Sequence, residues 1–359
     1  MSELKKRSMI SVLLILMTVL AGGLCLIPQQ AKGQEVSPDI SITAVGDVML
    51  GRNVDKKITA KGTDYPFRLL DGRLAAADIT FGNLESPLSD EGKALYGKSV
   101  VFRGDLAMAA VLRQQGFDIM SLANNHAMDY NSEALIETIT LLSENGIKSV
   151  GAGSDLQEAR KAVIITKNGL RVGFLAYTDK YYTDLFIKKS FAADDNKCGV
   201  TPLDEEMIME DLAALETQVD ITVVSLHWGK EYKDKPTSSD QKLAHDIIDG
   251  GAELILGHHP HRIQGVERYK NGLIAYSLGN FIFDQKSMLY MRQSMILDVK
   301  LAEQQVIEAS ITPVLISDCQ PAILTGSKAA TLLKKIAGYC SKLDTTTLIQ
   351  NDKLIINMN

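Results

Sequence analysis

Six short apolar runs in the sequence end abruptly and are followed by side chains that can bind a metal ion or transfer a proton. Runs of about four to eight residues rich in β-branched side chains are typical of buried strands. The runs and the residues after them are 41–46 with Asp47, 78–82 with Asn83 and Glu85, 118–123 with Asn124, Asn125 and His126, 220–226 with His227, 252–257 with His258, His259 and His261, and 273–279 with Asn280. Because the carboxyl ends of parallel strands face one crevice, we expect these side chains to lie close together.

Metal coordination is the chemistry that these residue types share. Carboxylates, amide carbonyls and imidazoles without a thiolate suit borderline divalent ions such as Mn, Fe or Zn. The candidate ligands are Asp47, Glu85, Asn125, His227, His259 and His261. Two ions about 3.5 to 4 Å apart need a bridging carboxylate, which Asp47 or Glu85 could supply. His259 and His261 flank Pro260 and point the same way if this segment is locally extended.

Each of these residues also has an ordinary structural interpretation when it is taken alone. Asp47 can cap a turn or a helix, and Glu85 can be a solvated loop acid. Asn83 and Asn280 each follow a glycine, which is common in turns. A single histidine is more often structural than a ligand, and His258 keeps that interpretation because its neighbours can supply the ligands.

Two further residues are left with two possible roles. Asp129 lies three residues after His126 and either begins the following helix or orients the His126 imidazole. Arg52 is either a surface base or a clamp for an anion.

The elements that must position these residues alternate along the chain. Stretches with helical periodicity lie at 66–77, 105–115, 132–145, 203–217 and 238–250. Strand, polar loop and helix in alternation predict an α/β fold with a largely parallel sheet. Five of the six histidines fall at the predicted strand ends, and only His245 lies in a predicted helix. Farther along, 292–316 predicts a hairpin and 327–341 a helix.

The composition is that of a globular protein with an acidic balance. The 359 residues are 45% apolar and 23% charged, and the net charge is −6. Because no basic domain or Lys/Arg stripe is present, we expect no nucleic acid partner. Four cysteines without CxxC spacing argue against a thiolate zinc site and against a disulfide framework. We expect Cys198, Cys319 and Cys340 to be free thiols, with a Cys319–Cys340 bridge as the alternative.

Residues 1–33 predict an export signal or a membrane anchor with a short linker. Lys5, Lys6 and Arg7 precede the uncharged apolar run 10–27. This run is longer than the core of about 7 to 15 residues in a cleaved signal and long enough to span a bilayer. We therefore expect a retained anchor helix, with cleavage near 31–33 as the alternative. The positive-inside rule then places the body at the extracytoplasmic face of the cell membrane, or outside the cell if the segment is cleaved.

The polar motifs together resemble the CapA family of capsule and poly-gamma-glutamate synthesis proteins, within the calcineurin-like metallophosphoesterase superfamily. The resemblance rests on Gly46-Asp47-Val-Met-Leu-Gly-Arg52, Gly82-Asn83-Leu-Glu85, Ala123-Asn-Asn-His126, His227-Trp-Gly229, Gly257-His-His-Pro-His261 and Leu278-Gly-Asn-Phe281. It implies an α/β (α+β) fold, a four-layer α/β/β/α sandwich of the calcineurin-like metallophosphatase type. We assign this domain to residues 38–316 and a C-terminal helical extension to 317–359.

The resemblance also implies a role for each matching residue. Asp47 is similar to the first metal aspartate, Glu85 to the bridging acid, and Asn125 to the metal-binding asparagine of a Gly-Asn-His motif. His126 then resembles the catalytic imidazole of that motif, and Asp129 would orient it.

The remaining histidines match the ligands of two ions. His227 and His259 resemble ligands of one metal, and His261 resembles a ligand of the other. Two departures stand out: Met49 replaces the histidine of the usual Asp-x-His motif, and Ala127 replaces the acid that commonly follows the catalytic histidine. A thioether is a poor ligand for a borderline ion, so one metal position lacks a donor.

The resulting hypothesis is a surface-anchored, metal-dependent phosphoesterase with one or two divalent ions. In it, His126 protonates the leaving oxygen, and Arg52, Asn83 and Asn280 contact an anionic polymer or phosphoester. The alternative is a non-enzymatic accessory subunit of a membrane polymer synthase or export complex. A secreted nucleotidase is a weaker third interpretation, because no second substrate-binding domain is evident after residue 285.

Overall fold

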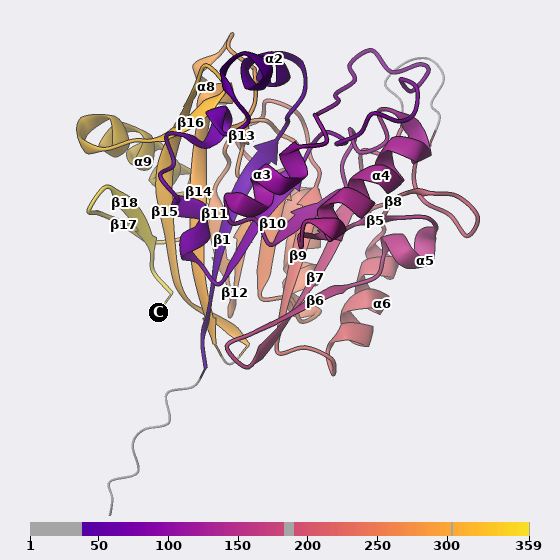
Figure 1. Cartoon of the computed structure of the whole chain (residues 1–359). Helices are drawn as coiled ribbons and strands as arrows, with labels where there is room; N and C mark the ends of the chain where they lie inside the picture. Colours follow the sequence, from indigo (N-terminus) through magenta and orange to yellow (C-terminus); the bar gives the residue numbers. More distant parts are fainter. Residues whose placement is uncertain (1–37, 183–189, 303, 359) are drawn as a thin grey trace, which may run out of the picture. The chain divides into compact units, whose positions relative to one another are not determined.

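The computed structural model describes residues 38–182, 190–302 and 304–358, which form a mixed α/β fold on two large sheets (Figure 1). The strands of the first sheet are β1 (Ile40–Val48), β2 (Ile79–Leu84), β3 (Ile119–Ser121), β4 (Lys148–Val150), β13 (Asn280–Ile282), β14 (Gln293–Ala302), β15 (Gln305–Ser317), β16 (Gln320–Ile323), β17 (Thr347–Gln350) and β18 (Lys353–Ile356). Their order is β17-β18-β15-β14-β1-β2-β3-β4, with β13 beside β1 and β16 beside β15. Strands β1 to β4 run parallel, whereas β14 pairs antiparallel with both β1 and β15.

The second sheet has the same plan, with a parallel centre and antiparallel edges. Its strands are β6 (Val163–Lys167), β7 (Leu170–Thr178), β9 (Ile221–His227), β10 (Leu254–His258), β11 (Val266–Tyr269) and β12 (Gly272–Ala275), in the order β11-β12-β10-β9-β7-β6. The short strands β5 (Ala152–Gly153) and β8 (Gly199–Val200) form a separate pair. The largely parallel sheet expected from the alternation of elements is present only in part, because hairpins add antiparallel strands and the parallel units divide between two sheets.

Five of the six predicted helices form, together with three that were not predicted, at 52–61, 156–159 and 289–292. They are α2 (Arg52–Lys61), α3 (Met108–Gln114), α4 (Asn131–Glu144), α5 (Leu156–Ala159), α6 (Glu205–Leu215), α7 (Ser238–Asp249), α8 (Leu289–Arg292) and α9 (Gly326–Ser341). Helix α7 begins with a capping box between Thr237 and Asp240, which satisfies two backbone N–H groups. The helix predicted over 66–77 is wrong: only two short 3₁₀ turns form, η1 (Tyr65–Phe67) and η2 (Arg73–Ala76). Asp71 and Gly72 between them have φ values of 47° and 71°, in the left-handed region that a helix cannot contain.

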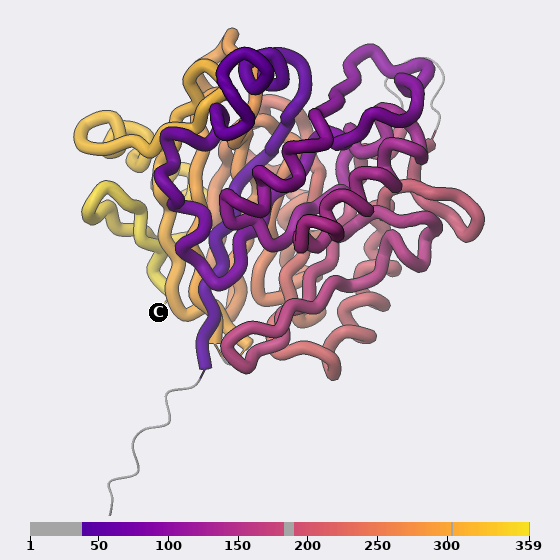
Figure 2. The backbone as a smooth tube through the Cα atoms, in the orientation of Figure 1, coloured from indigo at the N-terminus to yellow at the C-terminus, as the bar shows by residue number. Residues whose placement is uncertain are grey.

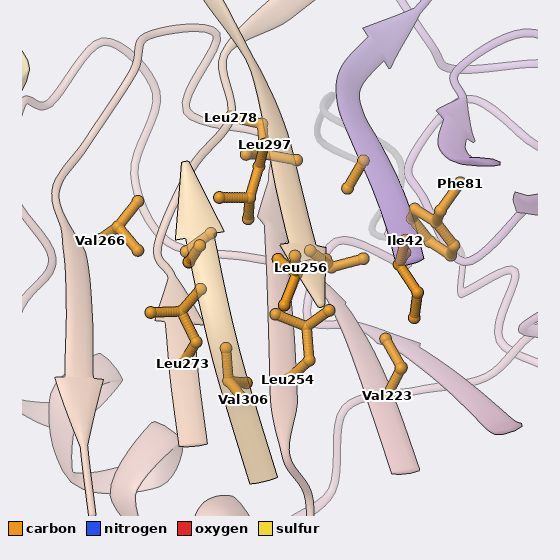
Figure 3. Close-up of a cluster of buried hydrophobic side chains, with 14 of the residues drawn as sticks. Ile42, Phe81, Val223, Leu254, Leu256, Val266, Leu273, Leu278, Leu297 and Val306 are labelled. Atoms are coloured by element: carbon orange, nitrogen blue, oxygen red, sulfur yellow. The ribbon is translucent and has the colours of Figure 1, made fainter. Parts of the chain in front are cut away.

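Three hydrophobic cores lie between the layers of helices and sheets. The core between the two sheets joins Ile42 and Phe81 of the first sheet to Val223 and Leu254 of the second (Figure 3). A second core lies between the first sheet and α2, α3 and α4, and a third lies between the second sheet and α6 and α7. Each fully buried aliphatic or aromatic side chain in such a core stabilises the fold by about 1.5 to 3 kcal/mol. The cores hold the two sheets face to face, so that their strand ends can meet.

The C-terminal residues are part of this architecture. Helix α9 contributes Leu332, Leu333 and Ile336 to the core between the sheets. Strand β18 pairs with β15, and β17 pairs with β18, so the chain end extends the first sheet (Figure 2). The helical extension predicted for 317–359 is thus incomplete, since it also contains three strands. The expected free thiols are confirmed, with Cys319 and Cys340 both buried and unbridged.

The predicted signal or anchor over residues 1–33 lies outside the described residues. Among the residues that the structure does describe, none of the helices combines the length and the apolar character needed to cross a bilayer.

Candidate functional site

The candidate site lies where the carboxyl ends of strands from both sheets meet. The first sheet supplies oxygen donors: Asp47 near the end of β1, Glu85 just after β2, and Asn125 in the loop after β3. The second sheet supplies imidazoles: His227 at the end of β9, and His259 and His261 just after β10. A contact between His258 Nε2 and the Val45 carbonyl oxygen, at 3.3 Å, joins the two sheets beside the site. The mixed donor set is therefore assembled across the sheets and not along one of them.

Glu85 is at the centre of the group, and its carboxylate has no hydrogen-bond partner. Its side chain is fully buried, and within the described part of the protein neither oxygen accepts a hydrogen bond. Oε1 lies 3.9 Å from Nε2 of His126, 3.9 Å from Nε2 of His227 and 3.7 Å from Nε2 of His261. Asp47 is also fully buried, and its Oδ2 likewise lacks a hydrogen bond. Buried carboxylate oxygens without partners are costly unless a cation compensates them.

These residues fit a divalent metal ion. Two donors at about 2.1 Å from one ion lie no more than about 4.2 Å apart, and the distances from Glu85 Oε1 to the imidazoles fall within that limit while exceeding hydrogen-bond length. One candidate ligand set consists of Asp47, Glu85 and His261, whose ligand atoms all lie within 4.8 Å of one another. Asn125 Oδ1 is 2.8 Å from His227 Nε2, so both of these predicted ligands also face the group.

Two predicted substrate contacts instead hold the ligands in position. Asn83 donates from Nδ2 to Asp47 Oδ1 at 2.9 Å and contacts His227 Nδ1 at 3.3 Å. Asn280 Oδ1 lies 2.9 Å from His261 Nδ1. Both asparagines are fully buried. Their amides are turned toward the ligands and are closed off from solvent, and the predicted contact with substrate stays a prediction.

His126 has a separate set of supports. Its Nδ1 lies 2.6 Å from Asp129 Oδ2, and its ring stacks on Phe102 with the ring centres 3.8 Å apart. The Phe102 N–H also donates to Asp129 Oδ2, at 2.6 Å. Lys98 donates to the other oxygen of Asp129 and to the Asn125 carbonyl, and both charged side chains are almost completely buried. This network fixes the imidazole with Nε2 facing Glu85.

Arg52 lies at the rim of the site and not inside it. Its guanidinium pairs with Asp284 and lies over the Phe102 ring, 4.4 Å from the ring centre. The side chain is 37% exposed. The Phe102 ring thus contacts both the Arg52 guanidinium and the His126 imidazole, and the partly exposed Arg52 side chain can meet an anion from solvent.

The two histidines after β10 converge by a different route from the predicted one. His259 and His261 have φ values of 92° and 52°, so the segment is left-handed at both positions and not extended. For residues other than glycine this conformation costs about 1 to 3 kcal/mol, and it is found mainly at functional sites. The correction follows from the sharp turn around Pro260, which brings both rings to the same side of the strand end, 5.9 Å apart.

Burial favours the neutral form of most titratable groups of the site, whereas neighbouring carboxylates favour the charged form of His261. Burial, followed by the neighbouring Asp47, raises the pKa of Glu85 well above its ordinary value of 4.5. Burial lowers the pKa of His126 to about 4 and holds the pKa values of His227 and His259 well below 6.5. For His261, burial is outweighed by the carboxylates of Glu85 and Asp47, which raise its pKa to about 9. One imidazolium thus faces two carboxylates, a position where a divalent cation would replace the proton.

Three residues of the site were not found from the sequence. Lys98 and Phe102 lie in a loop without periodicity, and nothing in their types or spacing marks them. Glu231 lies four residues after His227, and its carboxylate is close to His259 and His261. An acid in the same loop as a candidate ligand is a signal that could have identified it.

Met49, the residue at the departure from the Asp-x-His motif, makes a structural contact. It is fully buried, and its sulfur accepts a hydrogen bond from the Gly51 N–H at 3.1 Å. The thioether therefore adds no donor to the group around Glu85.

Comparison with known proteins supplies a family. The family described as bacterial capsule synthesis protein PGA_cap matches residues 41–285. The chain is 34% identical over 294 residues to PGA biosynthesis protein CapA of Bacillus subtilis (strain 168), covering 81% of this chain and 76% of that protein. It is 34% identical over 253 residues to capsule biosynthesis protein CapA of Bacillus anthracis, covering 68% of this chain and 60% of that protein. A "Probable polyglutamine synthesis accessory protein" of Mycobacterium tuberculosis (strain ATCC 25618 / H37Rv) is 28% identical over 297 residues, covering 70% of this chain and 77% of that protein.

Proposed function

The chain belongs to the PGA_cap family of bacterial capsule synthesis proteins, and we propose that it is a metal-dependent phosphoester hydrolase acting in capsule or poly-gamma-glutamate synthesis. The observation that carries the proposal is the Glu85 carboxylate, which is fully buried, has no hydrogen-bond partner in the described residues and faces three imidazole nitrogens. Buried carboxylate oxygens without hydrogen bonds are costly, so their position among imidazole nitrogens argues for a bound cation.

The calcineurin-like superfamily is the fold assignment that fits this site best. Its support is the layer order of helices, sheet, sheet and helices, together with ligands at the strand ends of both sheets. The proposed ligands are Asp47, Glu85, Asn125, His227, His259 and His261. Their oxygen and nitrogen donors favour Mn, Fe or Zn. When bound, such an ion supplies Lewis acidity toward a phosphoryl oxygen and acidifies water.

The protein's own contribution to the reaction centres on His126. Asp129 and Lys98 fix its ring so that Nε2 faces the ligand group, where it can pass a proton to the leaving oxygen of the ester. A lowered pKa makes the imidazolium a strong acid, although it is then sparsely populated at neutral pH. The phosphoester binds at the solvent side of the group, near the Arg52 guanidinium.

We place the site at the extracytoplasmic face of the cell membrane. The support is the run of three basic residues followed by the apolar stretch 10–27, which together favour a retained anchor. Proposed partners are the membrane, an anionic polymer or phosphoester, and the subunits of a polymer synthase.

The second candidate is a non-enzymatic accessory subunit of the polymer synthase or export complex. It is favoured by Met49, which leaves one metal position without an imidazole, and by the printed name of the mycobacterial relative, which calls that protein an accessory protein.

Two measurements on the purified chain distinguish these candidates. Elemental analysis reports the metal content, and a panel of phosphoesters with added Mn²⁺ reports turnover. Bound metal with turnover supports the hydrolase. Bound metal without turnover contradicts the hydrolytic step but leaves the cation site standing, whereas neither metal nor turnover favours the accessory role.

A further inference from the structure

A cluster of lysines lies on α2 and on the loop that follows β13, around a carboxylate in the turn between β15 and β16. Lys57 Nζ lies 2.7 Å and Lys61 Nζ lies 3.5 Å from Oδ2 of this carboxylate, Asp318. Lys286 Nζ approaches the other oxygen, Oδ1, at 3.6 Å. Three ammonium groups therefore face one carboxylate, in a chain whose net charge is −6. We call Lys57, Lys61 and Lys286 the lysine cluster.

Asp318 does not neutralise the lysine cluster. Its Oδ2 already accepts hydrogen bonds from Lys57 Nζ at 2.7 Å and from the Tyr65 hydroxyl at 2.8 Å. The distances to Lys61 and Lys286 exceed the usual N–H···O length of about 2.7 to 3.2 Å. Within the described residues, these two ammonium groups form an ion pair with no other carboxylate. Two positive charges are therefore left to attract an anion from outside.

The lysine cluster is continuous with the rim of the candidate site. Arg52 begins α2, and Lys57 and Lys61 follow on the same ten-residue helix, which is about 15 Å long. The loop after β13 carries both Asp284, which pairs with Arg52, and Lys286. Helix α2, helix α8 and strand β16 lie together at one end of the molecule (Figure 1). The positive charges thus form a row that leads from the Arg52 guanidinium along α2.

We propose that Arg52 and the lysine cluster form a binding surface for a polyanion, a chain that carries carboxylate or phosphate groups in series. The proposal rests on the proposed function and adds to it a surface outside the ligand group, where a long substrate is held while one ester lies at the site. Each exposed ion pair contributes little by itself, but a row of cations attracts a charged chain through its summed potential. A small anion meets only one or two of these groups.

The residues after Lys286 offer a lipid surface as the competing partner. Met288 and Leu289 are 50% and 60% exposed, and basic side chains beside apolar ones are typical of segments that lie on membranes. Lys57 and Lys61, however, are only 29% and 44% exposed, because both side chains turn toward the shared carboxylate. A flat bilayer contacts side chains that project from the surface, so a recessed row of cations favours a flexible chain.

The experiment measures the binding of fluorescently labelled polyglutamate and polyphosphate to the full chain by fluorescence anisotropy. A chelator is present throughout, so that binding reports this surface and not a metal ion. We expect both polymers to bind the wild type, and higher salt to weaken the binding. The combined variant Lys57→Gln, Lys61→Gln and Lys286→Gln should weaken it by roughly threefold to 100-fold, because three partly exposed ion contacts are lost.

The matched control removes the same charge from other elements. Lys148 on β4, Lys161 before β6 and Lys167 at the end of β6 are all exposed. Their combined change to Gln should leave the affinity within about twofold of the wild type at about 0.1 M salt, where the Debye length is about 10 Å. Thermal unfolding checks that both variants are folded. If the cluster variant is not, Lys286→Gln alone replaces it, since this side chain is 60% exposed.

Three results would overturn the proposal. The wild type binds neither polymer at this salt concentration, or the cluster variant binds them as tightly as the wild type does. The third is binding to vesicles that contain phosphatidylglycerol, when that binding depends on the lysine cluster and polymer binding does not. Binding of only one polymer supports the proposal and identifies the charged group of the ligand. Because the assay needs neither metal nor turnover, its failure leaves the proposed hydrolase standing, and a failed phosphoester panel leaves this surface standing.

Discussion

Two regions of this protein, a surface groove and the strand ends, differ in how their charges are satisfied. A groove of about 890 Å³ lies between η2 and the C-terminal hairpin β17–β18 and is lined by residues that include Arg73, Asp298 and Lys353. Its charges are paired: Asp298 bonds Arg73, accepts from Thr43 Oγ1 at 2.8 Å and lies 3.5 Å from Lys353 Nζ. At the strand ends, by contrast, the buried Glu85 carboxylate has no hydrogen bond in the described residues.

The difference shows that unsatisfied polarity marks this site better than volume does. A large apolar hollow is the usual first guess for a binding site. In the groove, however, Asp298 pairs with Arg73 and Lys353, and Lys300 pairs with Asp39, so the fold already accounts for these charges. At the strand ends the protein keeps Glu85, Asp47 and His259 with unpartnered atoms at a cost in stability. We therefore expect changes at the strand ends to alter metal binding and turnover, and changes in the groove to alter stability alone.

The largest effect is expected for turnover on removal of His126. His126→Ala should lower phosphoester turnover by roughly 10² to 10⁴, the usual contribution of a positioned general acid, and leave metal content nearly unchanged. The neighbouring Asn125→Ala is the internal control, because it removes a proposed ligand and should lower metal content. Elemental analysis and steady-state kinetics measure both. If His126→Ala removes as much metal as His259→Ala does, His126 is a ligand and its assigned role is wrong.

The next effect concerns the charge at the centre of the site. Glu85→Gln should lower Mn²⁺ affinity by more than about 100-fold, because outer partners of a ligand already account for about 10- to 100-fold. In the metal-free variant the pKa of His261 should fall from about 9, because the Glu85 carboxylate that helps to raise it has been removed. Calorimetric titration measures the affinity, and nuclear magnetic resonance titration of the histidine rings in the presence of a chelator measures the pKa. Affinity retained within tenfold would show that Glu85 does not bind the ion.

The third prediction concerns the pH dependence of the metal-free protein. The folded pKa of His261 is about 9, above its ordinary value of 6.5. Protonated His261 therefore stabilises the fold fully below pH about 6.5, and this contribution is lost as pH rises from about 6.5 to about 9. His126, with its pKa lowered to about 4, stays neutral throughout that window.

Nuclear magnetic resonance titration of the histidine rings in chelator-treated protein measures these values, and denaturant unfolding measures the stability. His261→Gln should flatten the stability profile between pH 6.5 and 9. A His261 ring that titrates at or below 6.5 would contradict the charge arrangement described for the strand ends.

The smallest effect belongs to the groove. Asp298→Asn removes the ion pairs with Arg73 and Lys353, which are partly exposed, so the free energy of unfolding should fall by about 1 kcal/mol. Mn²⁺ affinity and stoichiometry should not change. A loss of metal binding in this variant would show that the groove and the strand ends are coupled, and the contrast between them would fail.

Most elements could be predicted because their signals are local. Apolar periodicity located α3, α4, α6, α7 and α9, and the run over 292–316 gave the β14–β15 hairpin. The hairpin of β6 and β7 was not predicted, although the Asn168-Gly169 pair is a typical hairpin-turn sequence. In the structure these two residues have φ values of 53° and 82°, as a tight hairpin turn requires. The region 66–77 failed because periodicity does not report the left-handed pair that interrupts it.

The candidate site could be predicted in its residue types and not in its assembly. Polar residues after strands pointed to the proposed ligands, because histidines and carboxylates at the ends of several strands are better explained together by one shared site than each is alone. The residues that hold His126 in place could not be predicted. Lys98 lies 31 residues from Asp129 in sequence, and the Phe102 ring contacts His126 only in the folded chain. Asn83 and Asn280 were predicted to contact substrate, and the sequence does not show that their side-chain amides contact the proposed ligands.

The sequence by itself determined the kinds of donor, their order and the strands that carry them, because these follow from residue chemistry and short-range periodicity. The sequence also identified the family, because each family motif is a short run of consecutive residues. Only the tertiary structure decided that oxygen donors come from one sheet and imidazoles from another, and that β1 pairs with β14 far along the chain. Sheet partners and buried charge pairs depend on long-range packing, and many chain positions offer the same local pattern. Three features of the site therefore emerged only when the two sheets were packed together. They are the Glu85 carboxylate without a hydrogen bond in the described residues, the raised pKa of His261, and the place of Glu231 beside His259 and His261.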